Sequence, residues 1–430
     1  MDRRFVIRKD ILAYSFSIIL LVIYAFTTGL ASTIYRNGIG LYGTFFISVV
    51  SLFIASFRKR KNLKFSANEI WVILIITLMV FNNNANIQNG AYEQLLFSIT
   101  FYLAFIELNR SGEWINFFIS LVCPVGTFYA TATYFFRMNS EAYYSIVVPL
   151  FSNYTSAYQQ NYAYLNGFMN GFTPNGAINA FYIICSIGIL LTTLMSKPNR
   201  YKRSKILCIV FLAGAVLMTG KRAHIMFTVL AMVVVYFWSY KKNILKKYFK
   251  FLAIGVLGII IFIIASKYFP SLLSVFNKFE MQANEGRMDS GRFIMWKQAF
   301  EYFKSNFLFG IGWDRFKYSY GVLSGSALNV HNVYIQILTE MGILGAIPFF
   351  AFFVNSLHHV FKVLKIARDM DVINSRNKAF VMYALFIQIF FLLYCLTGNP
   401  LYDATTLFMY LLSCAIGDYF FYHQEALKRI

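Results

Sequence analysis

The chain has 430 residues, of which 58% are hydrophobic and only 13% are charged, and its formal net charge is +21. A soluble chain of this length is about a quarter charged, so the composition excludes a water-soluble globular protein and indicates a polytopic membrane protein. No basic soluble domain is present, which argues against a nucleic-acid partner and instead places the positive charge in loops beside anionic lipid.

Twelve apolar segments approach the length of about 20 residues that a bilayer core requires. In chain order they cover residues 11–30, 39–57, 69–84, 92–108, 114–135, 177–196, 205–220, 223–240, 251–268, 331–357, 379–397 and 404–422. Residues 1–10 lead directly into the first segment, so no cleavable signal is expected. The sequence predicts a single all-α membrane domain over residues 1–430 with about twelve transmembrane helices. The seventh and eighth segments are so close together that we expect a tight helical hairpin.

The basic residues predict the orientation of these helices. If both termini are cytoplasmic, the cytoplasmic segments hold 27 of the 39 Lys and Arg residues, in agreement with the positive-inside rule. Two longer segments then lie on the extracytoplasmic side: a Tyr-rich loop at 137–176 and a loop at 269–330. Loops of this length without a function are uncommon, so both are candidates for the functional side of the protein.

Two arginines belong to the expected outer face. Arg222 lies in "LMTGKRAHIMF" at the tip of the expected hairpin, followed by His224. An Arg at the centre of a bilayer is costly, so this residue is expected at the helix end.

Arg292 lies in "MDSGRFIMWKQAFEYF", where Asp289 or Ser290 can cap a helix. The spacing of Phe293, Trp296, Phe300 and Phe303 predicts one apolar stripe on an amphipathic surface helix. Arg292 falls in the first turn of that helix, where the helix dipole attracts anions.

His331 and Asn332 open the tenth segment at its outer end, in "GSALNVHNVYIQILTEMGILGAIPFF". The segment is longer than a span needs, so its first turn is expected to project toward the outer aqueous side. Glu340 lies about nine residues further, roughly 13 Å along a helix. We expect Glu340 to be buried and structural, paired with a neighbouring span, and not catalytic.

These motifs together resemble the superfamily of O-antigen polymerases and O-antigen ligases, which act on bacterial envelope polysaccharides. The resemblance is carried by the hairpin arginine, by "W..AF.YF..N...GIGWDRF" after Arg292, and by "HNVYIQILTEMGILG", the most specific motif. "GFTPNGAINAFYI" at 171–183 and "TGNPLYD" at 397–403 are similar to two further elements of the family. The hairpin reads "GKRA" where the family pattern has Ser-Arg. The resemblance covers about 170–420.

The resemblance implies a GT-C-type helical architecture and a bacterial inner-membrane glycosyltransferase without metal or cofactor. Arg222 and Arg292 would bind the diphosphate of an undecaprenyl-diphosphate-linked glycan donor, and His331 would act as the base at the acceptor hydroxyl. Asn332, Asn175 and Tyr334 would add contacts to the substrate. The favoured activity is a polymerase for O-antigen or capsular repeat units, in which a flippase and a chain-length regulator would be partners.

Two alternatives stay open at this point. An O-antigen ligase would transfer the glycan to lipid A-core or to protein. A lipid-linked oligosaccharide flippase or secondary transporter would also have twelve spans, but it should show repeated halves and charged residues in mid-membrane. The sequence shows no internal repeat, and its polar candidates gather on one face.

Overall fold

The computed structural model describes residues 9–34, 43, 45–52, 65–82, 89–151, 154–196, 201–239, 292–325, 327–370 and 374–428. In these residues all regular structure is helical and no strand is present. The predicted all-α fold is therefore confirmed. The expected helix cap at Asp289 or Ser290 lies outside the described residues, as does the expected span 251–268 and most of 39–57.

Within the described residues, six helices are long and apolar enough to cross a membrane. They are α5 (Glu113–Met138), α8 (Gly176–Ser196), α10 (Arg222–Ser239), α15 (Val333–Asp369), α16 (Ser375–Tyr394) and α17 (Ala404–Tyr422). Four further expected spans also coincide with helices: α1 (Lys9–Ile34), α3 (Ala67–Phe81), α4 (Asn89–Leu108) and α9 (Lys202–Met218). The chain is thus a polytopic α-helical membrane protein, but twelve spans are not shown. The reason is visible in α3, which has only 15 residues, and in α9, whose first turn is basic.

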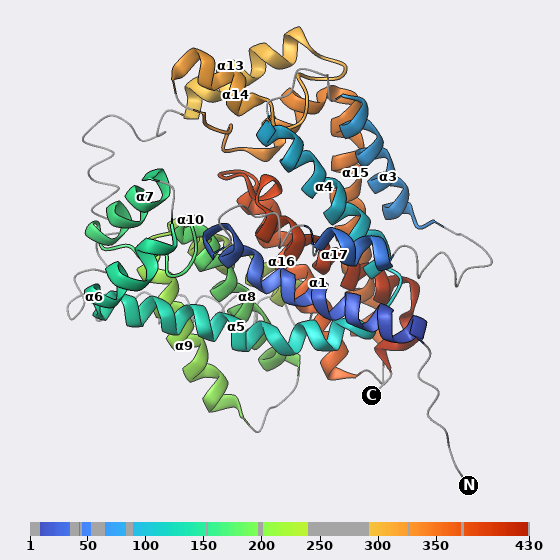
Figure 1. Cartoon of the computed structure of the whole chain (residues 1–430). Coiled ribbons are helices and arrows are strands. Elements are labelled where there is room, and N and C mark those ends of the chain that lie inside the picture. Colours follow the sequence, from blue (N-terminus) through green and yellow to red (C-terminus); the bar gives the residue numbers. More distant parts are fainter. Residues whose placement is uncertain are drawn as a thin grey trace.

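The centre of the bundle is formed by α8, α16 and α17, and most of their residues are buried. Helix α16 packs against α8, α10, α15 and α17, while α5 and α9 cover another side of α8 (Figure 1). These central helices are apolar over their whole circumference, which is typical of helices that are surrounded by other helices.

The predicted tight helical hairpin is wrong. Helices α9 and α10 are joined by the short turn 219–221, but they diverge from it. Helix α9 packs mainly on α8 and α5, whereas α10 packs mainly on α16 (Figure 1). A short connection brings two helix ends together, but their apolar faces decide which neighbours they bury against. The tip of the turn still presents Lys221 and Arg222 at one end of the bundle.

Short helices cover that same end. The segment after α5 folds into α6 (Ser140–Ala142), η1 (Tyr143–Val147), η2 (Val148–Leu150) and α7 (Tyr154–Leu165). Helices α13 (Arg292–Ser305) and α14 (Phe316–Ser324) form a separate layer above the start of α15 (Figure 1). Two single turns, η4 (Pro400–Tyr402) and η5 (Gln424–Leu427), flank α17.

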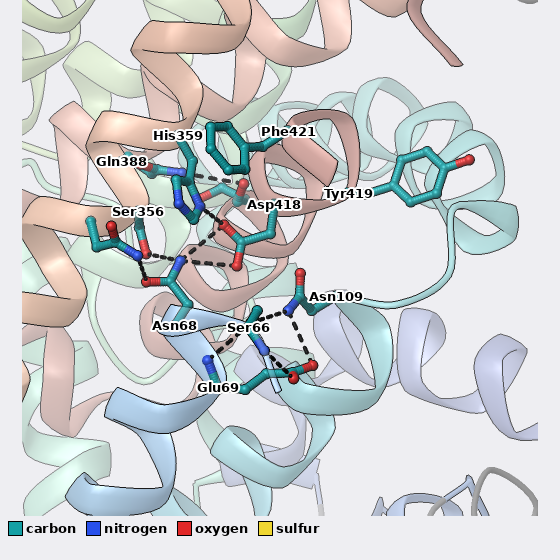
Figure 2. A network of polar contacts seen from close by, with 12 residues as sticks. Ser66, Asn68, Glu69, Asn109, Ser356, His359, Gln388, Asp418, Tyr419 and Phe421 are labelled. Atoms are coloured by element: carbon teal, nitrogen blue, oxygen red, sulfur yellow. Dashed lines mark hydrogen bonds and ion pairs between the residues drawn. The ribbon is translucent and has the colours of Figure 1, made fainter. Parts of the chain in front are cut away.

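A buried polar network ties α3 to α15 and α17 away from this end (Figure 2). The Asn68 amide donates to both carboxylate oxygens of Asp418 at 2.9 Å, and Nδ1 of His359 lies 2.7 Å from Asp418. One residue on, Glu69 closes a capping box with Ser66 at the start of α3. Because buried polar groups are costly unless they are paired, this network fixes how three helices meet.

Candidate functional site

The turn that carries His331 is held in an unusual backbone conformation. His331 has a φ of 57°, in the left-handed region that residues other than Gly rarely occupy. The next residue, Asn332, is the N-cap of α15, and its side-chain oxygen accepts from the backbone N–H groups of Tyr334 and Ile335. The backbone N–H of Val333 donates to the carbonyl of Cys395 at 2.9 Å. The turn is therefore fixed to the end of α16.

His331 contacts a residue of the connection between α16 and α17. Its Nδ1 lies 3.2 Å from the side-chain nitrogen of Asn399. Asn399 precedes Pro400 in the "TGNPLYD" motif, and its own carbonyl accepts from the N–H of Tyr402 at 3.0 Å. Asn399 had no role assigned from the sequence, although the motif that contains it is part of the family resemblance.

Two cations act on this histidine. Burial lowers the pKa of His331, and the positive charges of Arg292 and Lys221 lower it further. Arg292 is the first residue of α13, and Lys221 closes the turn between α9 and α10. The imidazole is consequently neutral at neutral pH. Arg292 thus lies within electrostatic range of His331, and so does Lys221, which was not selected from the sequence.

The tip of the α9–α10 turn is anchored by aromatic packing. His224, one turn into α10, is buried, and its ring centroid lies 4.5 Å from that of Tyr394 and 5.5 Å from that of Phe390. Both aromatic residues belong to the last turns of α16. A Cβ added at Gly176, at the start of α8, would lie 3.3 Å from the Cε of Lys221. The tip is therefore placed against α8 and α16, beside the turn of His331.

The other predicted site residues surround this centre. Arg222 is the half-buried first residue of α10, directly after Lys221. The side-chain oxygen of Asn175 accepts from the N–H groups of Ala177 and Ile178 at the start of α8. The hydroxyl of Tyr334 donates to the carbonyl of Leu392 at 2.8 Å. Asn175, Asn332 and Tyr334 thus make structural bonds at the edge of the site, and their contact with substrate stays a prediction.

Helix α13 is confirmed, but only part of its predicted stripe packs on the protein. Met295 and Ala299 are buried against α15, whereas Phe293 and Phe300 are 65% and 45% exposed. The indole N–H of Trp296 donates to the carbonyl of Val330 at 3.0 Å, which links the helix to the residue before His331. Phe293 and Phe300 therefore face away from the bundle, whereas Trp296, together with Met295 and Ala299, holds α13 in place and so sets the position of Arg292.

A kink in α15 joins the loop after α13 to the helix. At Gly342 the backbone turns to a φ of 61° and a ψ of −170°, which interrupts the helical hydrogen bonds. The loop 306–312 replaces them: the N–H of Gly312 donates to the carbonyl of Glu340, and the N–H of Ile343 donates to the carbonyl of Phe307. A Cβ at Gly310 would lie 2.4 Å from the backbone of Glu340, so only Gly fits there.

The carboxylate of Glu340 completes this joint. It is fully buried and accepts hydrogen bonds from the backbone N–H groups of Asp314 (2.8 Å) and Phe316 (3.1 Å). The Gln336 amide and the Tyr402 hydroxyl donate to it at 3.0 and 2.6 Å. Glu340 is buried and structural as predicted, but its partners from other elements lie at the start of α14 and in η4, and not in a neighbouring span.

The described residues contain no group of three or more His, Cys, Asp or Glu side chains that could hold a metal ion. What they bring together is a neutral histidine, two cations and a side-chain amide. Cations bind phosphate groups through charge-assisted hydrogen bonds, and a neutral imidazole can accept a proton. The site can therefore bind an anionic phosphate group next to a base.

The comparisons with known proteins agree with the resemblance. A family model described as O-antigen ligase matches residues 207–350, which include Lys221, Arg222, Arg292 and His331. The resemblance to the superfamily of O-antigen polymerases and ligases is thus confirmed over this segment. No curated protein matches the chain.

Proposed function

We propose that this membrane protein, with its family match across the site, is a polymerase of lipid-linked glycan repeat units. Its donor and acceptor are undecaprenyl-diphosphate-linked oligosaccharides on the outer side of a bacterial inner membrane. The observation that carries the proposal is the half-buried, neutral His331, on which Arg292 and Lys221 both act. A sugar hydroxyl needs a base to become a nucleophile, and a diphosphate leaving group needs positive charge.

The proposed reaction is one displacement at the anomeric carbon of the donor. The acceptor hydroxyl oxygen forms a bond to this carbon while the bond from the carbon to the diphosphate oxygen breaks. His331 takes the hydroxyl proton, and the lipid diphosphate leaves with the electron pair. Attack opposite the leaving group inverts the anomeric centre. Arg222 and Arg292 bind the phosphate oxygens, because guanidinium groups form paired hydrogen bonds to them.

The segment 137–176 supplies a surface suited to sugar rings. On α7, Tyr158 and Tyr162 are 58% and 55% exposed, and their rings stack with centroids 6.4 Å apart. An aromatic face presents an apolar surface and a polar hydroxyl at once. We assign this pair to the acceptor or donor glycan, on the same end of the bundle as His331. Flippase and chain-length regulator proteins are the proposed partners.

A test uses the purified protein in lipid nanodiscs with undecaprenyl-diphosphate-linked repeat units. The wild type should form a ladder of polymer on a gel, also in the presence of EDTA. His331→Ala and His331→Gln should each lose turnover by about 10²-fold or more, since neither side chain can take the proton. Arg222→Ala should abolish chain growth in a folded protein. Arg203→Ala, at the exposed start of α9, is its matched control and should retain activity.

A ligase is the second candidate, because the matching family model is described as O-antigen ligase. The same assay separates the two when lipid A-core is added. A ladder without lipid A-core identifies a polymerase, whereas glycan transfer that requires lipid A-core identifies a ligase. If EDTA abolishes turnover and Mg²⁺ restores it, the metal-independent mechanism is wrong.

A further inference from the structure

We propose that Asn399 positions the base: its side-chain oxygen accepts the Nδ1 proton of His331 and leaves Nε2 free to take the proton of the acceptor. The contact between His331 and Asn399 does not depend on the proposed reaction. Its catalytic meaning rests on the proposed glycosyl transfer.

The contact between the two side chains has two possible orientations. With the amide nitrogen toward the ring, at 3.2 Å, the lone pair is on Nδ1 and the proton is on Nε2. With the amide oxygen toward the ring, the proton is on Nδ1 and the lone pair on Nε2. The nitrogen and oxygen of an Asn side chain have nearly the same shape, so the hydrogen-bond network decides between the two.

The proposed base role requires the second orientation. With the nitrogen toward His331, the Asn399 oxygen is buried and has no hydrogen-bond partner among the described residues. A buried acceptor without a donor destabilises the structure by about 1–3 kcal/mol. Turning the amide gives this oxygen the Nδ1–H of His331 as its donor. The amide N–H groups then occupy the buried position on the far side, so each orientation leaves one end of the amide without a partner among the described residues, and the tautomer of His331 decides between them.

The backbone holds both residues so that this contact persists. His331 is fixed by its left-handed backbone conformation and by the hydrogen bond from the backbone N–H of Val333 to the carbonyl of Cys395. On the other side, Pro400 follows Asn399, and the carbonyl of Pro400 accepts from the Thr406 hydroxyl at 2.6 Å. Both segments are therefore attached to helix ends, and neither depends on a long free loop. A positioning contact needs this rigidity.

A neutral partner suits this histidine better than a carboxylate does. The charges that act on His331 are Arg292 from α13 and Lys221 from the α9–α10 turn. A carboxylate at position 399 would attract these cations and compete with a diphosphate for them. It would also favour the charged imidazolium, which cannot act as a base. An amide fixes the tautomer of the ring without adding charge.

Two further titratable groups belong to the same elements. The first is Tyr394, in the last turn of α16. The second is Asp403, which acts electrostatically on Tyr394 and whose own pKa is raised by burial. The Asp403 side chain caps α17 by accepting from the N–H of Thr406 at 3.0 Å. Asp403 thus has its own structural partner, so Asn399 is the side chain with a contact to Nδ1 of His331.

The experiment measures the tautomer directly and does not depend on activity. The protein is produced with ¹⁵N-labelled histidine, and the His331 signals are assigned by their loss in His331→Ala. In the wild type, the neutral ring should carry its proton on Nδ1. In Asn399→Ala this preference should fall toward the mixture of tautomers found for free imidazole. A wild-type ring protonated on Nε2, or a tautomer ratio unchanged in Asn399→Ala, would overturn the proposal.

Kinetics then add the catalytic part. Asn399→Ala should lower kcat by about 10- to 100-fold, as loss of an orienting partner typically does, while KM for the donor stays within about twofold. Asn399→Asp should keep Nδ1 protonated, raise the pKa of His331 and move the acid limb of kcat/KM to higher pH. Asn306→Ala, an exposed Asn after α13, is the matched control and should match the wild type. Unchanged kcat in Asn399→Ala would refute the catalytic part.

The two proposals fail in different ways. If the Nδ1 proton is found but His331→Ala keeps full activity, the base assignment in the proposed function is wrong and the contact with Asn399 stands. If His331→Ala is inactive but the proton is on Nε2, the positioning role of Asn399 is wrong. The wild-type spectrum decides the tautomer even if Asn399→Ala does not fold.

Discussion

Replacing Glu340 by Gln tests the joint between α15 and the extramembrane layer. The two side chains have nearly the same shape, but Gln offers one oxygen and one NH₂ group where the carboxylate offers two oxygens. Two of the four donors would then face another donor. The Tyr402 hydroxyl and the Gln336 amide can reorient, whereas the backbone N–H groups of Asp314 and Phe316 cannot. At least one buried N–H is left unpaired.

The free-energy cost of Glu340→Gln follows from the number of hydrogen bonds that are lost and from general hydrogen-bond energies. An unpaired buried N–H costs about 1–3 kcal/mol, and the bonds to a charged acceptor are each worth about 1.5–3 kcal/mol. We therefore expect Glu340→Gln to destabilise the joint locally by about 2–4 kcal/mol. At 1.36 kcal/mol per factor of ten, this is a rise of roughly 30- to 900-fold in local opening. The segment 306–325 should open while the rest of the bundle stays closed.

Hydrogen exchange measures this opening. Peptides that cover 306–325 should exchange faster in Glu340→Gln in nanodiscs, and peptides from α8 and α17 should not change. Glu301→Gln is the matched control, because the Glu301 side chain is 55% exposed and only bonds Lys304. Unchanged exchange at 306–325 in Glu340→Gln would show that the four hydrogen bonds do not hold the loop, and the reasoning would be refuted.

Three further outcomes follow from the site and the topology. Because the positive charge of Lys221 helps to keep the pKa of His331 below its ordinary value, Lys221→Gln should raise that pKa. The neutral base would then be lost at a higher pH, and the acid limb of kcat/KM should move upward; an unmoved limb would separate Lys221 from the site. Arg292→Ala should abolish polymer growth in a folded protein, and Arg292→Lys should restore only part of it, since an ammonium group lacks the paired donors of a guanidinium; equal activity of both would remove Arg292 from phosphate binding. A Cys at Ser324 should react with an impermeant reagent in spheroplasts and a Cys at Asn62 should not, and the reverse result would invert the topology.

The helices could be predicted from the sequence because each is a long apolar run. Helix α15 has features that an apolar run does not predict. Its start at Asn332 follows from capping preferences, but the kink at Gly342 depends on a loop about 30 residues earlier that supplies the missing hydrogen bonds. The helix also continues to Asp369, beyond the expected end at 357, because Val360, Val363 and Leu364 are buried against the bundle. Hydropathy alone predicts neither the kink nor the packing of the second half of α15.

The site divides in a similar way. Arg292 and His331 could be chosen because each lies in a motif that resembles the family and belongs to the expected outer face. Asn399 and Lys221 gave weaker signals: an amide in a turn has many structural uses, and a Lys beside an Arg is ordinary at a helix end. Only the packing of α10 on α16 and the turn after α16 bring them to His331. Where "GKRA" departs from the family pattern, the departure itself supplies the additional cation.

The network in Figure 2 sets a condition on biogenesis. The first turn of α3 contains Asn68 and Glu69, which are costly to place in lipid without partners. Asn68 finds its acceptor in Asp418, 350 residues later in the chain and within the last membrane helix. An apolar helix of only 15 residues with these polar groups would gain little from insertion alone. We therefore expect α3 to reach its final packing only after α17 has been synthesised, so a chain truncated before α17 should leave α3 accessible to membrane quality control.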